Sequence, residues 1–227
     1  MPYPFAHPAA VIPLARFGVP SALVIGSIVP DLWYFVPWAS RHFSHSLAGL
    51  ALFCLPVGAL LYLVFHLVLK QALIALLSTR LGAFTPSGLP SARWRAVTLS
   101  LAAGALTHLG WDGLTHSNSI QGHNWVQHVN TALGTLVLVA WLWHKLRNVQ
   151  PVAPELSLKA KICVTALLAA GAACGAWLVE TRADIALRHW LRSEGIAAAQ
   201  GLFFALLAYC ALWQLQRKIP LRGTRRA

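Results

Sequence analysis

Charged side chains are scarce in this sequence. Only 11% of the 227 residues are Asp, Glu, Lys or Arg and 57% are hydrophobic, whereas about 25% of an ordinary soluble domain is charged. This composition excludes an ordinary soluble domain and predicts an all-α, polytopic membrane protein. Because a membrane-spanning helix needs about 20 apolar residues, we expect five spans, at residues 46–69, 97–116, 129–145, 161–179 and 196–216.

One further apolar segment, residues 20–37, is interrupted by Gly26, Pro30 and Pro37. The residue before a proline avoids the helical region, whereas proline itself favours the first position of a helix. One helix is therefore expected to end near Val29 and another to begin at Pro30. The segment is predicted to be a broken or re-entrant helix.

The sequence also lacks the motifs of several other protein classes. Its four cysteines lie in apolar stretches without a CxxC pair, so they indicate packing rather than a disulfide framework or a zinc knot. No P-loop, GxGxxG motif or nucleophile elbow is present. The N-terminus has no basic region, and no cleavable signal peptide is expected.

Acidic residues are rarer than basic ones, and the net charge is +12. The basic residues gather in residues 70–95, in 145–161 and after 217, and these clusters alternate with neutral or mixed connectors. Such alternation is the positive-inside pattern, with anionic-lipid contact by the tail as a second interpretation. It predicts an integral membrane protein with a cytoplasmic C-terminus, and membrane lipid rather than nucleic acid as its partner.

The same features divide the chain into four predicted parts. The first is a helical membrane domain with a polar, metal-binding site, followed by a cytoplasmic linker, two plain transmembrane helices and a basic cytoplasmic tail. Their expected bounds are 1–145, 146–160, 161–216 and 217–227.

Two of the six acidic residues, Asp31 and Asp112, lie among apolar residues. A carboxylate in a membrane costs about 2.5 kcal/mol or more unless it is paired. His108, Asp112 and His116 are spaced four residues apart, so they share one helix face. An HxxxD pair can supply an imidazole and a carboxylate to one metal ion. The alternative is a buried His–Asp hydrogen bond that joins two helices.

The positive-inside pattern assigns the connectors 38–45, 117–127 and 180–195 to the outer side of the membrane. Several other histidines lie at or near this side. His45 begins a span, where Ser44 could cap the helix. His128 opens another helix and can face His108, and His123 lies in the polar loop before it. His116 could bind a second ion, position a substrate phosphate or lie at the membrane interface. Asp31 could be a metal ligand or a partner of a helix dipole.

The order of these residues resembles a bacterial membrane protein family described as a domain of unknown function (domain of unknown function 4184). More remotely, it is similar to the zinc-dependent phospholipase C and P1 nuclease group and to inner-membrane metal-dependent hydrolases. The resemblance implies a location in the bacterial inner (plasma) membrane. It also implies six metal ligands and two further candidates, His116 and His123. The six ligands are His7, Asp31, His45, His108, Asp112 and His128.

The chain departs from the phospholipase group at two ligand positions. That group also binds metal through an N-terminal Trp and a late Glu in an HxxxE arrangement. Here Met1 is followed by Pro2 and not by Trp. In the segment that begins at His128, the position of the Glu is occupied by Ala132. We therefore expect one or two ions rather than three.

The function expected from these residues is hydrolysis of phosphoesters, including lipid-linked ones, by metal-activated water. Asp112 and Asp31 are the expected catalytic residues, and zinc is the expected ion, with manganese and iron as alternatives. An amphiphilic phosphorylated substrate would suit a site in a membrane. A His/Asp-based ion or metal transporter and a non-catalytic assembly protein are the competing hypotheses.

Overall fold

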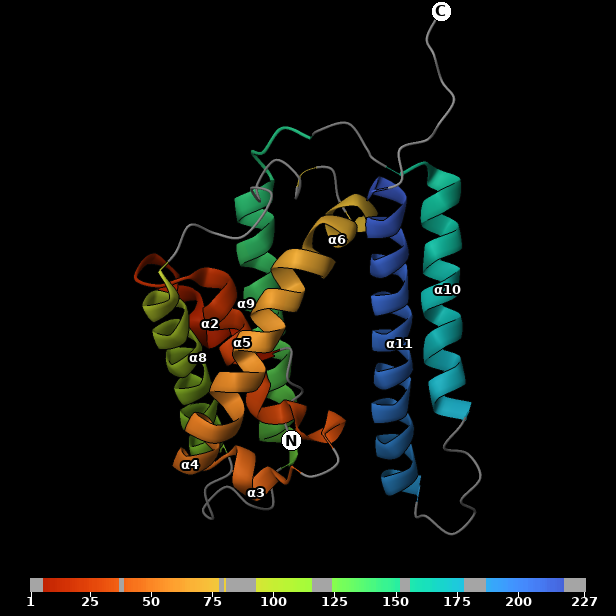
Figure 1. Ribbon diagram of the computed structural model, residues 1–227. Helices are drawn as coiled ribbons and strands as arrows, with labels where there is room; N and C mark the ends of the chain where they lie inside the picture. The colour runs from red at the N-terminus through yellow and green to blue at the C-terminus, as the bar shows by residue number, and fades with distance from the viewer. Residues whose placement is uncertain are drawn as a thin grey trace, which may run out of the picture. The chain divides into compact units, whose positions relative to one another are not determined.

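The computed structural model describes residues 6–36, 39–77, 80, 93–115, 124–151, 156–177 and 187–218. These residues form helices and their connections, and the described part of the chain contains no strand, so the predicted all-α class is confirmed (Figure 1). The chain divides into two compact units. The first comprises Met1–Val64 and Leu89–Val149, and the second comprises Phe65–Gly88 and Gln150–Ala227.

The first unit combines several short helices with three longer ones. The predicted break in residues 20–37 lies between α2 and η3, where the helix ends at Gly26 and a 3₁₀ helix begins at Val29 with Pro30 in its first turn. The helices of this unit are α1 (Pro8–Val11), η2 (Ile12–Arg16), α2 (Pro20–Gly26), η3 (Val29–Phe35), α3 (Arg41–Ser44), α4 (Leu47–Gly49), η4 (Leu50–Cys54), α5 (Leu55–Val64), α8 (Trp94–Thr115) and α9 (Asn124–Leu146).

Helices α2 and α8 pack with their backbones in contact. A Cβ atom on Gly26 would overlap the carbonyl oxygen of Leu101, and one on Gly104 would overlap that of Leu23. Only glycine permits so close an approach at these positions. The contact brings the turn of α8 that follows Gly104 against the C-terminal end of α2.

The second unit contains η5 (Phe65–Leu69), α6 (Lys70–Leu77), α10 (Leu158–Trp177) and α11 (Leu187–Lys218). Helices α10 and α11 lie side by side and antiparallel (Figure 1). Small residues line their contact, since a Cβ on Gly201 would overlap the carbonyl oxygen of Gly171. Helix α11 also bonds to the other two helices, because the Tyr209 hydroxyl donates to the Ala72 carbonyl at 3.0 Å and the Gln214 amide donates to that of Leu67 at 3.2 Å.

Three helices in the described part of the chain are long and apolar enough to cross a membrane: Leu47–Leu77, Leu158–Trp177 and Gly195–Arg217. The prediction of five spans is therefore not supported. Helices α8 and α9 form where the spans 97–116 and 129–145 were predicted, but polar residues interrupt their apolar character. These residues include Arg95, Ser100, His108 and Asp112 in α8, and Asn130, Thr131, His144 and Lys145 in α9.

The α2–α8 contact predicts opposite effects for two Gly-to-Ala changes in the same helix. Gly104→Ala should destabilise the protein by about 1–3 kcal/mol, because the added methyl group overpacks the contact. At Gly110 no atom lies within 4 Å of an added Cβ, so Gly110→Ala should stabilise α8 by about 0.5–1 kcal/mol. Thermal unfolding in detergent measures both effects. Equal shifts in the two melting temperatures would contradict the close packing.

The α10–α11 pair allows the same comparison in the second unit. Gly201→Ala should lower the melting temperature of the purified protein, since its methyl group would push the two helices apart. Gly195 lies in the same helix with open space around its Cβ position, so Gly195→Ala is the matched control and should not lower it. A lower melting temperature for the control alone would show that the contact is placed wrongly.

Candidate metal centre

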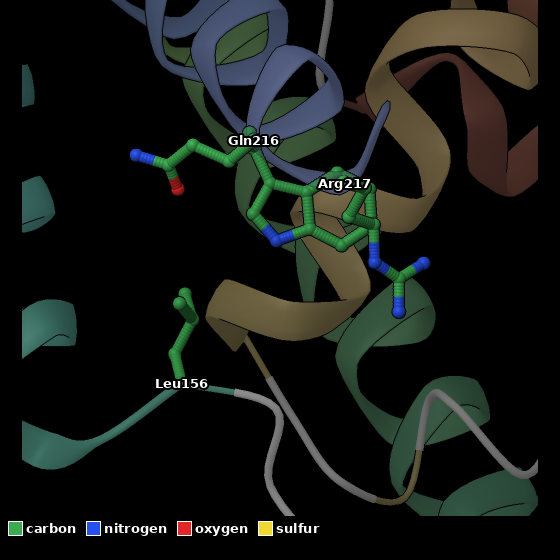
Figure 2. A pocket seen from close by; sticks show the side chains of 4 residues that line it. Leu156, Gln216 and Arg217 are labelled. Carbon is green, nitrogen blue, oxygen red and sulfur yellow. The ribbon is translucent and has the colours of Figure 1, made fainter. Parts of the chain in front are cut away.

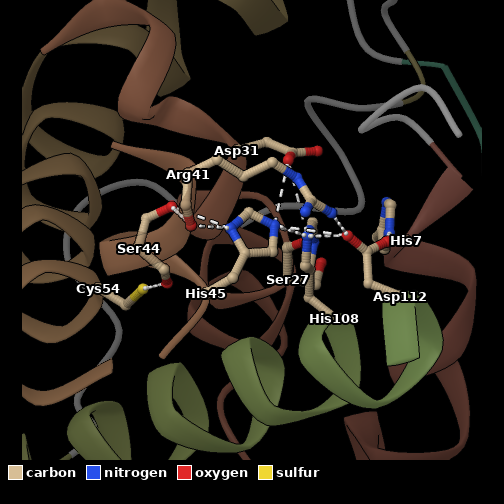
Figure 3. Close-up of polar contacts among 9 residues, drawn as sticks. All are labelled: His7, Ser27, Asp31, Arg41, Ser44, His45, Cys54, His108 and Asp112. Atoms are coloured by element: carbon tan, nitrogen blue, oxygen red, sulfur yellow. Dashed lines mark hydrogen bonds and ion pairs between the residues drawn. The ribbon is translucent and has the colours of Figure 1, made fainter. Parts of the chain in front are cut away.

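Six polar side chains of the first unit converge on one point (Figure 3). They come from the segment before α1, from η3, from α3 and the residue after it, and from α8. Four of them are almost completely buried, with exposures of 1–9% for His7, Asp31, His108 and Asp112. The other two are Arg41 and His45.

The imidazole of His108 is oriented by the end of α2. Its Nδ1 lies 2.8 Å from the carbonyl oxygen of Ser27, the C-cap residue of α2. A carbonyl oxygen only accepts, so Nδ1 carries the proton and donates it. The lone pair of His108 is therefore on Nε2, which points into the centre, as in metal-binding histidines whose other nitrogen donates to the protein.

The imidazole of His45 is also protonated at Nδ1, although its hydrogen-bond partners differ. Its Nδ1 lies 3.1 Å from the carbonyl oxygen of Arg41 and 2.9 Å from the Ser44 hydroxyl, so the lone pair is again on Nε2. The idea that Ser44 caps the following helix is wrong, because Ser46 caps α4 by accepting a hydrogen bond from the Gly49 amide. The role of Ser44 is to contact the imidazole.

Four atoms with lone pairs meet between these two histidines. Nε2 of His45 lies 3.3 Å from Nε2 of His108, 3.6 Å from Asp31 Oδ1 and 3.4 Å from Asp112 Oδ2. Nε2 of His108 lies 3.7 and 3.8 Å from the same two oxygens. Ligands at 2.0–2.1 Å from a tetrahedral ion are about 3.3–3.4 Å apart, so these five distances are close to the spacing of ligands around one metal ion.

The two oxygens of Asp112 have different partners. Oδ1 lies 3.2 Å from His7 Nε2, and Oδ2 accepts a hydrogen bond of 2.9 Å from Arg41 Nη2. The ring of His7 stacks on that of His108 at 3.9 Å. His7 and Arg41 thus fix the plane of the carboxylate from its two ends.

The carboxylates favour a positive charge between them. Burial by itself lowers the pKa of His45, but Asp112 and Asp31 outweigh it, because their carboxylates stabilise the protonated imidazole, and they raise the pKa above its ordinary value. With neutral imidazoles, the two carboxylates and the guanidinium of Arg41 give the cluster a net charge of about −1. A cation at the centre is therefore electrostatically favourable.

Two groups of three residues could hold a metal ion: His7, His108 and Asp112, and Asp31, His45 and His108. Both groups need His108. Since Nδ1 of His108 donates to Ser27, only its Nε2 is available as a ligand. The described side chains therefore offer one complete site. In it, Asp31, His45, His108 and Asp112 Oδ2 would surround the ion, and His7 would hold Asp112 in place through its other oxygen.

The structure brings together five of the predicted site residues, namely His7, Asp31, His45, His108 and Asp112. His128 lies on α9, but its side chain is outside the described part of the structure. His116 and His123 also lie outside the described residues.

Arg41 is the residue of this cluster that the sequence analysis missed. A signal for it was present, because Arg41 is the only Lys or Arg in residues 17–69. It lies in a connector that the charge pattern assigns to the outer side, where positive residues are disfavoured. It also precedes His45 by four residues, which is the spacing of one helix face.

A pocket in the second unit has different chemistry. It is lined by Leu156, Trp213, Gln216 and Arg217 (Figure 2), and the guanidinium of Arg217 lies 4.4 Å from the centre of the Trp213 ring. None of these four side chains is an imidazole, carboxylate or thiol. The pocket therefore lacks the usual metal ligands, and the cluster around His108 is the candidate site.

Comparison with known proteins supports the resemblance to the domain of unknown function and no other. The family described as a domain of unknown function (DUF4184) matches residues 1–211. No curated protein and no solved structure matches the chain, so the more remote likeness to phospholipases and nucleases stays a prediction. With nearly the whole sequence covered by the match, the chain belongs to the DUF4184 family.

Proposed function

We propose that this protein is a membrane-bound, metal-dependent hydrolase of phosphoesters. The observation that carries the proposal is the convergence of four lone-pair atoms, from Asp31, His45, His108 and Asp112, in which each of the two imidazole Nε2 atoms lies 3.3–3.8 Å from the other three atoms. The three helices that are apolar enough to cross a membrane support a membrane location.

The facing imidazoles favour a cation over a simple hydrogen-bonded cluster. Both Nδ1 atoms donate to carbonyl oxygens, so two neutral imidazoles would direct lone pairs at each other across 3.3 Å. That contact is repulsive unless a proton or a metal ion lies between them. A proton would satisfy one pair of atoms, whereas an ion would satisfy both imidazoles and both carboxylates.

The ligand set favours zinc. Two imidazole nitrogens and two carboxylate oxygens in a compact, four-membered set suit Zn²⁺, and manganese and iron also accept these donors. The nearest cysteine, Cys54, directs its sulfur to the Ser44 carbonyl at 3.5 Å and is not part of the set. We propose one ion in the centre.

A divalent ion that took a water as a fifth ligand, beside the four protein donors, would lower the pKa of that water toward about 7 and supply hydroxide for attack on phosphorus. Asp31 is then the better general base of the two carboxylates. Both oxygens of Asp112 have partners in His7 and Arg41. Asp31 contacts the imidazoles through Oδ1, and no described residue forms a hydrogen bond or ion pair with its Oδ2, which is free to accept the proton.

The membrane setting favours an amphiphilic substrate. A phosphorylated head group could reach the centre while its acyl chains stay in the lipid. The pattern of basic loops supports a position on the outer side of the membrane, and we propose that the centre lies on the outer side of a bacterial inner membrane.

Metal analysis tests the centre directly. Detergent-purified wild type should hold about one zinc ion per chain, and the His108→Ala/Asp112→Ala double variant should hold almost none, because it loses two of four ligands. His144→Ala removes an exposed histidine of α9 and should keep the wild-type content. Elemental mass spectrometry gives the metal-to-protein ratio for all three.

Wild-type protein that takes up no metal, even after zinc is supplied, would overturn the proposal and favour a hydrogen-bonded His–Asp cluster in an assembly protein. Hydrolysis of phosphatidic acid and of p-nitrophenyl phosphate should require the ion and be abolished in the double variant. Metal uptake into proteoliposomes without hydrolysis would instead support the transporter hypothesis.

A further inference from the structure

We propose that Arg41 binds the anionic phosphoryl oxygens of the substrate, and that this anion site forms when the metal binds. The inference rests on the proposed function, since it names the residue that would recognise the substrate of the same centre. The reasons are the position of the guanidinium, its unused N–H groups and the charge of the cluster.

The guanidinium lies at the edge of the centre. It extends across the imidazoles toward Asp112 (Figure 3), and Nη2 lies 2.9 Å from Asp112 Oδ2, the same oxygen that faces His45 Nε2 at 3.4 Å. The side chain of Arg41 is 35% exposed, whereas that of Asp112 is 10% exposed. Arg41 therefore reaches both solvent and the ligand oxygens, so a substrate could contact the guanidinium and the ion together.

Most of the hydrogen-bonding capacity of Arg41 is unused. Its Nε is buried and has no hydrogen-bond partner among the described residues. Asp112 is the one described side chain that its terminal nitrogens contact. A guanidinium presents five N–H donors in a planar fork that matches two oxygens of a phosphate. The unused donors suit such a ligand, because a buried N–H without a partner is costly.

The charge of the cluster makes anion binding depend on the metal. Two carboxylates and one guanidinium leave a net negative charge, which repels phosphate. A divalent ion would make the same cluster net positive. The ion would also share Asp112 Oδ2 with Arg41 and weaken the hydrogen bond that now holds the guanidinium. Metal and anion should therefore bind cooperatively, each raising the affinity of the other.

The backbone of Arg41 has a separate task that a side-chain change leaves intact. Its carbonyl oxygen accepts the hydrogen bond from His45 Nδ1, and the helix that it opens is capped by Ser40. Replacement of the side chain thus keeps the contact that orients His45. This separation allows anion binding to be tested without loss of the metal.

The test measures the binding of inorganic phosphate and of zinc to the full-length protein in detergent by isothermal titration calorimetry. Zinc-loaded Arg41→Ala should bind phosphate about 10- to 100-fold more weakly than wild type, as expected for loss of a charge-assisted, bidentate contact. Its zinc affinity should be equal or higher, because a competing cation is removed. Arg41→Lys keeps the charge but not the fork, and its phosphate affinity should fall between the two.

Arg16→Ala is the matched control, since the exposed Arg16 lies over the Phe17 ring and forms no hydrogen bond or ion pair with the six residues of the centre. It should bind both zinc and phosphate as wild type does. A second arm replaces inorganic phosphate with phosphatidic acid in mixed micelles. A loss confined to this arm identifies a lipid head group as the source of the anion, and a loss in both arms identifies the phosphoryl group itself.

Unchanged affinity for both inorganic phosphate and phosphatidic acid in zinc-loaded Arg41→Ala would overturn the inference while leaving the metal centre in place. Loss of zinc together with phosphate would also overturn it, because Arg41 would then support the metal site instead. Wild type that binds no zinc would refute the proposed function, and the inference would fail with it.

Discussion

The hydrogen bond between His108 and the Ser27 carbonyl is the contact on which the centre depends. It joins α8 to the end of α2 at 2.8 Å and decides which nitrogen of His108 carries a lone pair. The bond exists because Gly26 and Gly104 let the two helix backbones touch. A single additional carbon atom at either glycine would move the imidazole away from its partner.

The broken backbone after α2 contributes equally to this arrangement. Because the helix stops at Gly26, the Ser27 carbonyl near its end is available to His108. The next turn begins with Pro30 and presents Asp31 to the two imidazoles. One interruption in the chain thus supplies both an orienting acceptor and a ligand.

The buried carboxylates explain why a guanidinium is part of the cluster. Asp31 and Asp112 are almost completely buried in a protein with few charges, and a buried charge is tolerated when it is paired. Arg41 pairs with Asp112, and Asp31 faces two imidazoles. The cluster is therefore stable enough to fold and still keeps a negative charge that favours a divalent ion.

The sequence alone determined the helical class, the break before Pro30 and the residue types of the centre. Composition and the four-residue spacing of His108 and Asp112 are local properties, and local properties are readable along the chain. The resemblance to the DUF4184 family supplied His7, whose local context carries no signal. The expectation of five spans is not supported, because it rested on the scarcity of charged residues in α8 and α9 and gave too little weight to their other polar residues.

Tertiary structure decided the roles of these residues. The Nδ1 of His45 bonds locally, to the Arg41 carbonyl four residues earlier. The Nδ1 of His108 instead bonds to the Ser27 carbonyl across 81 residues of chain, so the direction of its lone pair depends on helix packing. The same is true of Arg41, whose guanidinium meets Asp112 across 71 residues of chain. Such contacts follow from helix packing, which a linear pattern of residue types does not encode. The sequence thus named most of the side chains, and packing determined which atoms of them face one another.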